Sequence, residues 1–495
     1  MISVVQRRFA PPRSRRVRGA ARALGSAAGA GIAALLVAFL VANGLWYVAV
    51  AALLAIPVFV VVHRYPLAMV AVWLFVMPLI VVSNSPALRK LYWVIHRGLP
   101  LTTLLVLMIA AGCGINGRRL AKLGWAEVLM AAYVIMSLVS ILYLSSTPLA
   151  TFYVLYDRVI VPMMLYLIVR LVEPDDRDLD RLAWVVLFVF AFQVLVGILT
   201  WTHPGVLPAP WLQPPGRTDG SFGDPDVFLL TVLFCGLIMI HRGLTSDRWT
   251  TSKVPAAIVF SVMALMVFIT FSRGDWVAGT VALTGALYVF RQYLGSLLLI
   301  AIPVGVLLLV SGMLSGQLQY AQQRLHSTET AIGRLPVDVA ALRMLEVKPV
   351  AGWGYGNFDI YSPPFQQRVG NFIVPDKDHS SHNMFLSILA EQGLLGFALF
   401  LSPMAYWLVK TRASMANMPD TDRKLLASMW LVVAAVLITN NFSVMKVPYG
   451  LGLWWIALGL IGSLVHRYRP VHRPGLGGPA IGSGSAVRRV QRVAA

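Results

Sequence analysis

The sequence is short of charge, and of acidic charge in particular. Charged residues make up 13% of the chain, with 21 acidic against 41 basic side chains. A soluble globular domain carries roughly 25% charged residues. Two cysteines, Cys113 and Cys235, are too few for a disulfide framework. The alternation of apolar and polar residues typical of strands is also missing, which excludes a membrane barrel.

Hydrophobic residues make up 58% of the 495 residues. They gather in runs of about 17–25 residues, each long enough to cross a bilayer as a helix. A lipid-exposed backbone must satisfy its own hydrogen bonds, which helices do within one segment. We therefore expect an all-α, polytopic transmembrane bundle of about fourteen spans, with twelve as the lower bound. The apolar runs fall near 24–42, 45–62, 66–83, 99–115, 125–145, 150–171, 182–201, 226–241, 254–271, 275–290, 294–311, 384–409, 425–443 and 449–465.

The positions of the basic residues predict the orientation. Residues 1–23 are rich in arginine, and the positive-inside rule places them in the cytoplasm. The apolar run that follows them reads as a retained anchor, not a cleaved signal peptide. Alternate connections are then basic and cytoplasmic, as is the tail at 466–495, which reads as disordered. Residues 24–311 are predicted to form helices 1–11, and residues 384–465 helices 12–14. The net charge of +20 thus mainly reflects basic residues in the predicted cytoplasmic segments, and it is not a sign of nucleic-acid binding.

Two connections on the predicted outer face are too long to be simple links. The first is 202–225, and the second is the long loop, residues 312–383. Ordered loops of this length are often functional. The long loop contains helix-like stretches at 317–330 and 336–347, and the glycine-rich GWGYGNF at 352–358 predicts a tight turn.

Several polar residues at the predicted outer boundary permit two interpretations. FSRGD at 271–275 places Ser272, Arg273 and Asp275 between two apolar runs, where the arginine can simply snorkel. His382 and Asn383, in HSSHN, precede the next run and can be ordinary boundary residues. Taken alone, His382 favours a structural role, whereas the FSRGD segment favours neither interpretation.

The D-x-D pair of Asp224 and Asp226 also has two interpretations. Such a pair can hold a divalent metal, but its place beside Pro225 favours capping of a helix N-terminus.

Taken together, Arg217, Arg273 and His382 favour chemistry. They come from distant parts of the sequence, and the charge pattern assigns all three to one face. Arginine forks bind phosphate oxygens, and a histidine near neutrality accepts a proton from an attacking hydroxyl. That combination suits glycan transfer from a lipid-linked diphosphate to an alcohol.

The segments that carry these residues resemble a known family. FSRGDW at 271–276, GWGYGNF at 352–358 and HNMFLSILAEQGLLGFALFL at 382–401 are similar to the signature of the O-antigen ligase and Wzy-type O-antigen polymerase superfamily. RTDGSFGDPD at 217–226 resembles the arginine-containing outer loop of that family. The likeness covers roughly residues 200–445.

The resemblance implies a glycosyltransferase of the C-type (GT-C-like) membrane architecture. Arg217 and Arg273 would hold the donor diphosphate, and His382 would activate the acceptor hydroxyl. Arg343, Ser272 and Asn383 would help to bind substrate. No cofactor and no metal ion are expected. The chain departs from the family at Asp224 and Asp226, where asparagines are usual, and at Asp275.

The function expected is transfer of a glycan from undecaprenyl diphosphate to an acceptor sugar hydroxyl, with inversion, in the polymerisation or ligation of O-antigen or exopolysaccharide. The expected partners are that lipid-linked donor, a glycan or lipid-glycan acceptor and membrane lipids, at a bacterial inner membrane. A polysaccharide or lipid transporter or flippase remains open, as does a peptidoglycan-type polymerase. So do a protein O-glycosyltransferase and a scaffold without chemistry.

Overall fold

The structure is a computed structural model. It describes residues 57, 59–81, 85–113, 120–211, 217–246, 253–312, 315–326, 334–370, 372 and 381–469. Within these ranges the regular elements are all helical, and an isolated bridge pairs Val369 with Phe372. The prediction of an all-α chain is therefore confirmed for the part of the chain that is described.

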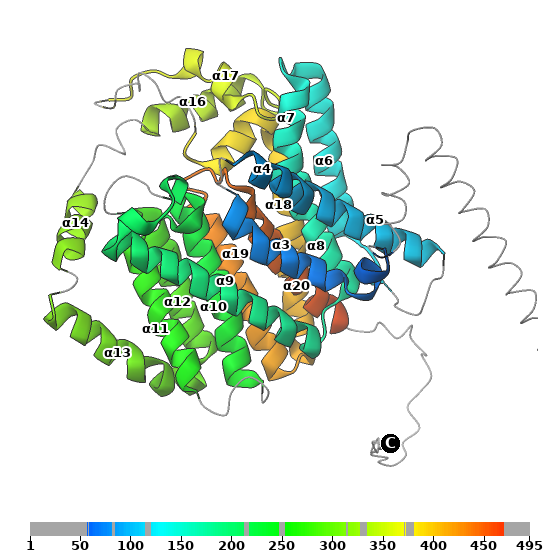
Figure 1. The fold of residues 1–495 in the computed structure, drawn as a ribbon. Coiled ribbons are helices and arrows are strands. Elements are labelled where there is room, and N and C mark those ends of the chain that lie inside the picture. Colours follow the sequence, from blue (N-terminus) through cyan, green and yellow to red (C-terminus); the bar gives the residue numbers. More distant parts are fainter. Residues whose placement is uncertain are drawn as a thin grey trace, which may run out of the picture.

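Helices cover almost every apolar run that lies in the described ranges (Figure 1). The first half of the chain forms α3 (Pro66–Ile80), α4 (Pro86–Tyr92), the π-helix η1 (Trp93–Gly98), α5 (Leu99–Gly112), α6 (Trp125–Leu144), α7 (Pro148–Leu155), the π-helix η2 (Tyr156–Ile160), α8 (Val161–Val172) and α9 (Asp176–Thr202). The second half forms α10 (Pro225–Thr245), α11 (Val254–Ile269), α12 (Arg273–Val289), α13 (Leu294–Val310), α14 (Ser315–His326), α16 (Arg334–Val347), α17 (Phe358–Tyr361), α18 (Met384–Ser414), α19 (Asp420–Thr439) and α20 (Pro448–Arg467). Short 3-10 turns lie between several of them.

Seven of these helical stretches are long and apolar enough to cross a membrane. They are Pro86–Gly112, Trp125–Leu144, Pro148–Val172, Asp176–Thr202, Pro225–Thr245, Met384–Asn417 and Pro448–Arg467. A bent pair, α12 and α13 with 81° between them, would make an eighth. The chain is therefore a multi-pass helical membrane protein. The predicted run at 24–42 lies outside the described residues, as do most of the run at 45–62 and the tail beyond 469.

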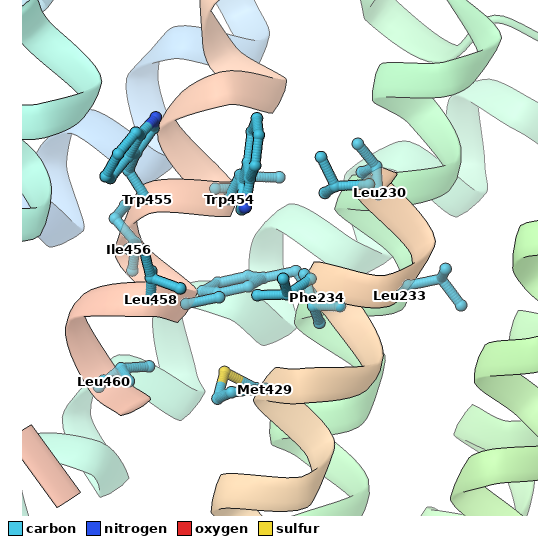
Figure 2. Close-up of a cluster of buried hydrophobic side chains, with 14 of the residues drawn as sticks. Leu230, Leu233, Phe234, Met429, Trp454, Trp455, Ile456, Leu458 and Leu460 are labelled. Carbon is cyan, nitrogen blue, oxygen red and sulfur yellow. The ribbon is translucent and has the colours of Figure 1, made fainter. Parts of the chain in front are cut away.

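Two helices form the centre of the bundle. In α10 and α20, 94% of the apolar window is buried by protein, against 33% in α6. Leu230, Leu233 and Phe234 of α10 lie close to Met429 of α19 and to the apolar face of α20 (Figure 2). Small residues allow the helices to pack this closely. At Gly452 of α20, an added Cβ would lie 2.2 Å from the ring of Trp73. The central pair thus has neighbours on all sides, whereas α6 exposes about two thirds of its window.

The GWGYGNF turn packs against a break in α18. Gly393 has φ of 63°, which interrupts the helix, and its neighbours Leu394 and Leu395 donate to the carbonyls of Pro349 and Val350. Glu391 accepts hydrogen bonds from the backbone N–H groups of Gly356 and Phe358, at 2.8 and 3.1 Å. The glycine-rich turn is therefore fixed to the helix that begins just after His382.

The predicted helices of the long loop are present as α14 and α16. In Figure 1, α16 and α17 lie over one end of the bundle, near the ends of α6 and α7. Met344 and Val337 of α16 form a small apolar cluster with Phe358 and with Ala390 of α18. The long loop is thus held by a small apolar cluster at the end of the bundle where the candidate site lies.

Candidate functional site

A cavity of about 710 Å³ opens where α10, α12 and α16 begin and where the chain enters α18. We call it the cationic cavity, because five basic side chains line it against three acidic ones. The basic residues are Arg217, Arg273, Arg324, Arg334 and Lys446, and the acidic ones are Asp224, Asp226 and Asp338.

Four residues proposed from the sequence meet at this cavity. Arg217, Ser272, Arg273 and His382 all line it, although up to 165 residues separate them. Asn383 instead caps α18, its side chain accepting from the N–H groups of Phe385 and Leu386.

Arg343 lies outside the lining. Its Nη1 donates to the carbonyl of Phe365 at 3.0 Å, within the long loop.

Arg217 is held at the cavity by a short, buried loop. Thr218 donates to the carbonyl of Ile269 at the end of α11. Ser221 donates to the carbonyl of Pro78 in α3 at 2.6 Å and accepts from Gln193 of α9. Arg217 Nε lies 3.5 Å from Asp219 Oδ1, but neither atom makes a hydrogen bond within the described chain. The loop thus fixes Arg217 at the cavity, beside Asp219.

Arg273 is the first residue of α12. Trp276, one turn later, donates from Nε1 to the carbonyl of Phe268 at 2.9 Å and stacks on the ring of Phe268. Phe271 has φ of 49°, so the chain reverses sharply between α11 and α12. Backbone N–H groups at a helix start favour anions, and the start of α12, which has no side-chain cap, opens into the cavity.

His382 is presented by a locked turn. The hydroxyl of Ser381 donates to the carbonyl of Asn383 at 2.9 Å and accepts from its N–H at 3.1 Å. Met384 donates to the carbonyl of Asn440, which ties this turn to the end of α19. His382 is thus positioned by residues on both sides of it.

Three lining cations were not found from the sequence. Arg324 of α14 donates to the carbonyl of Phe271 at 3.4 Å, and Arg334 of α16 to that of Phe442 at 3.1 Å. Lys446 lies between α19 and α20. Burial and the neighbouring charge of Arg273 lower the pKa of the Arg334 guanidinium. The positive charges are therefore close enough to oppose one another, a strain that a bound anion would relieve.

One carboxylate of the D-x-D pair has a structural role. Asp224 is the N-cap of α10 and accepts from the N–H groups of Asp226 and Val227, at 3.0 and 3.4 Å. Burial, then the nearby charge of Asp226, raises the pKa of Asp224 to about 7. Burial also raises the pKa of Asp219 to about 6, against the opposing effect of Arg217.

Asp275 does not line the cavity and is wholly buried beneath it. Among the described residues, no group of three or more histidine, cysteine or acidic side chains is arranged to hold a metal ion.

One comparison with known proteins gives a match. Residues 258–401 match the family model described as O-Antigen ligase. The match contains Arg273, the GWGYGNF turn and His382, whereas Arg217 and Lys446 lie outside it. No curated protein matches the chain. The segment from α11 into α18 is thus similar to the O-antigen ligase family over residues 258–401.

Proposed function

We propose that this protein is an inverting membrane glycosyltransferase that moves a glycan from undecaprenyl diphosphate to a sugar hydroxyl during polymerisation or ligation of a cell-surface polysaccharide. The observation that carries the proposal is the cationic cavity, which gathers five basic side chains and the start of α12 around His382. A lipid-linked diphosphate matches that positive charge in sign and in its number of acceptor oxygens.

In this mechanism Arg217 and Arg273 bind the diphosphate, with Arg324, Arg334 and Lys446 as further cations. The acceptor hydroxyl attacks the anomeric carbon from the face opposite the diphosphate. The bond from that carbon to the diphosphate oxygen breaks as the new glycosidic bond forms, and His382 takes the hydroxyl proton. Positive groups fixed where the leaving charge develops usually supply the largest catalytic effect.

We further propose that the cationic cavity faces away from the cytoplasm. The long loop belongs to the face that the positive-inside rule assigns to the outside, and α14 and α16 bring Arg324 and Arg334 to the cavity. A bundle of about fourteen spans with the C-type architecture, at the inner membrane, completes this proposal.

A transporter or flippase has less support. Ionisable residues on a transport path are expected inside the membrane and free to change partners. Several charged residues within the described spans are instead held in pairs. Arg97 binds both oxygens of Asp157 at 2.6 and 2.7 Å, and Arg242 donates to Asp180 at 2.9 Å. Asp157 is thus paired with Arg97, on another helix.

Substituting Arg217 and Arg273 singly with lysine tests the proposal. Lysine keeps the charge but loses the planar fork. We expect transfer to fall at least about tenfold, since one charge-assisted hydrogen bond is worth roughly 1.5–3 kcal/mol. The donor is the lipid-linked glycan that accumulates in a strain lacking this protein, and the assay follows its turnover by purified protein in nanodiscs.

Arg368→Lys is the matched control. Arg368 lies in the long loop but does not line the cationic cavity, and its Nε donates to the carbonyl of Gly370 at an exposed position. The control is expected to retain wild-type turnover. Wild-type turnover in both the Arg217 and Arg273 variants, at normal yield, would show that these arginines do not bind the donor diphosphate in this cavity.

A further inference from the structure

A second cavity, of about 360 Å³, adjoins the cationic cavity. We call it the side cavity. Ser381, Val444 and Lys446 line both cavities, so the two meet beside His382. Its volume lies within the roughly 300–1,000 Å³ of small-molecule sites. Neither the sequence motifs nor the family match assigns it a role.

The side cavity combines aromatic rings with hydrogen-bonding groups. Tyr355 of the GWGYGNF turn and Trp454 and Trp455 of α20 supply ring surface, while Arg158, Asp359 and Ser387 supply donors and acceptors. In Figure 2 the two indoles lie together at one end of the central cluster. Sugar rings present apolar C–H faces and a rim of hydroxyls, which such a mixture of groups complements.

Two of these groups have hydrogen-bonding capacity that the described protein does not use. Trp454 is fully buried, and its Nε1–H has no hydrogen-bond partner. A buried donor left unpaired costs roughly 1–3 kcal/mol.

Arg158 is the second. It lies in the π-helix η2, and π-helical turns often occur at functional sites. Because Arg97 holds the preceding carboxylate of Asp157, Arg158 makes no hydrogen bond or ion pair with the residues described.

We propose that the side cavity is the acceptor saccharide site, an inference that rests on the proposed function. A sugar there accepts hydrogen bonds from Trp454 and Arg158 and donates to Asp359. Its reacting hydroxyl passes Ser381 to reach His382 and the anomeric carbon of the donor.

A polyprenyl tail does not fit this lining, since it would bury Arg158 and Asp359 against hydrocarbon without partners. Inversion also requires the hydroxyl to approach from the side away from the diphosphate. An acceptor in the adjoining cavity meets that requirement.

The test uses Trp454→Phe and Arg158→Gln in the full chain in nanodiscs. Phenylalanine keeps an aromatic ring, and the lost N–H had no protein partner. The probe is the oligosaccharide released by mild acid from the accumulated lipid-linked glycan, supplied as acceptor. Its KM is expected to rise at least about tenfold, the effect of one lost hydrogen bond to a buried group, while the donor KM stays within about twofold of the wild-type value.

Two further variants keep the test decisive. Asp359→Asn, at an exposed position on α17, should raise the acceptor KM without endangering the fold. Trp430→Phe is the matched control: its Nε1 donates to Thr411 at 3.1 Å, and it lines neither cavity. The control should retain the wild-type acceptor KM.

A raised donor KM with an unchanged acceptor KM would assign the side cavity to the donor sugar and overturn the proposal. Unchanged values for both, with Arg217→Lys impaired, would overturn it while the proposed function stands. If the wild type transfers nothing from the lipid diphosphate, the proposed function fails. Saturation-transfer NMR then tests whether the oligosaccharide binds in the side cavity. Loss of binding in Trp454→Phe would support the acceptor site, and binding equal to that of the wild type would refute it.

Discussion

His382 stands where the two cavities meet, so its removal should affect the chemical step more than binding of the donor. We expect His382→Ala to leave donor affinity nearly unchanged and to lower transfer by about 10²–10⁴, the usual contribution of a general base. Single-turnover rates and binding of labelled donor measure the two effects separately. An equal loss in both would make His382 a donor-binding residue.

Asp224 should make stability depend on pH. Its pKa is about 7 when folded against an ordinary value of 3.8. A raised acid pKa stabilises the fold below pH 4, and that stability is lost as pH rises through 7.

Asp224→Asn removes this loss and keeps the cap, because asparagine caps helices as well as aspartate does. The advantage of the variant over wild type in free energy of unfolding should be at least about 1 kcal/mol larger at pH 8 than at pH 5, the equivalent of one pKa unit. Unfolding in detergent at both pH values measures this gain. A gain that is the same at both would show that Asp224 does not titrate there.

The sequence led to Arg217, Arg273 and His382 because motifs and the charge pattern mark them. It did not lead to Arg324, Arg334 or Lys446. A basic residue in a loop has no periodicity and no fixed spacing, and only the fold shows whether it points at solvent or at a cavity. The pairing of Asp157 with Arg97 was missed for a related reason, since the two residues lie on different helices.

At the scale of the element, the contact between the GWGYGNF turn and α18 depends on glycine. A Cβ at Gly352 would lie 2.4 Å from the backbone carbon of Glu391, whereas one at Gly370 would meet nothing within 4 Å. Both glycines have positive φ.

Gly352→Ala should therefore detach the turn, and Gly370→Ala should cost only the roughly 1–2 kcal/mol of left-handed strain. Limited proteolysis of residues 348–365 and transfer activity measure the difference. Equal behaviour of the two variants would mean that the close contact is dispensable.

Helices were predictable from apolar runs, but their irregularities were not. The run at 384–409 predicts one span, and α18 indeed begins at Met384. The break at Gly393 arises from a loop 40 residues earlier in the chain. The 81° bend between α12 and α13 likewise depends on packing that hydropathy does not encode.

For the molecule as a whole, orientation in the membrane is the proposal on which the others depend. Single cysteines at Gly316 of α14 and at Gly478, which lies outside the described residues, test it in a background without Cys113 and Cys235. Only Gly316→Cys should react with an impermeant maleimide in intact spheroplasts. Labelling of Gly478→Cys there would reverse the orientation and place the cationic cavity in the cytoplasm.

Hydropathy and charge thus indicated the class of fold, and the motifs indicated the resemblance to a family. Neither indicated the order of helices around the centre. Every apolar run has nearly the same composition, so nothing in it distinguishes the central α10 from the peripheral α6. Side-chain packing between helices makes that distinction, and packing depends on pairs of residues distant in the chain.

The central place of α20 has a consequence for how the protein is made. This helix follows α3, α8, α10, α18 and α19 in the sequence, yet all five pack against it. Until it inserts, the groove that receives it stays lined by residues such as Trp73 and Tyr166, with only lipid to fill it. The earlier helices therefore complete their packing only once α20 has been made and inserted, and a chain cut short before Pro448 would leave the translocon with its interior open to lipid.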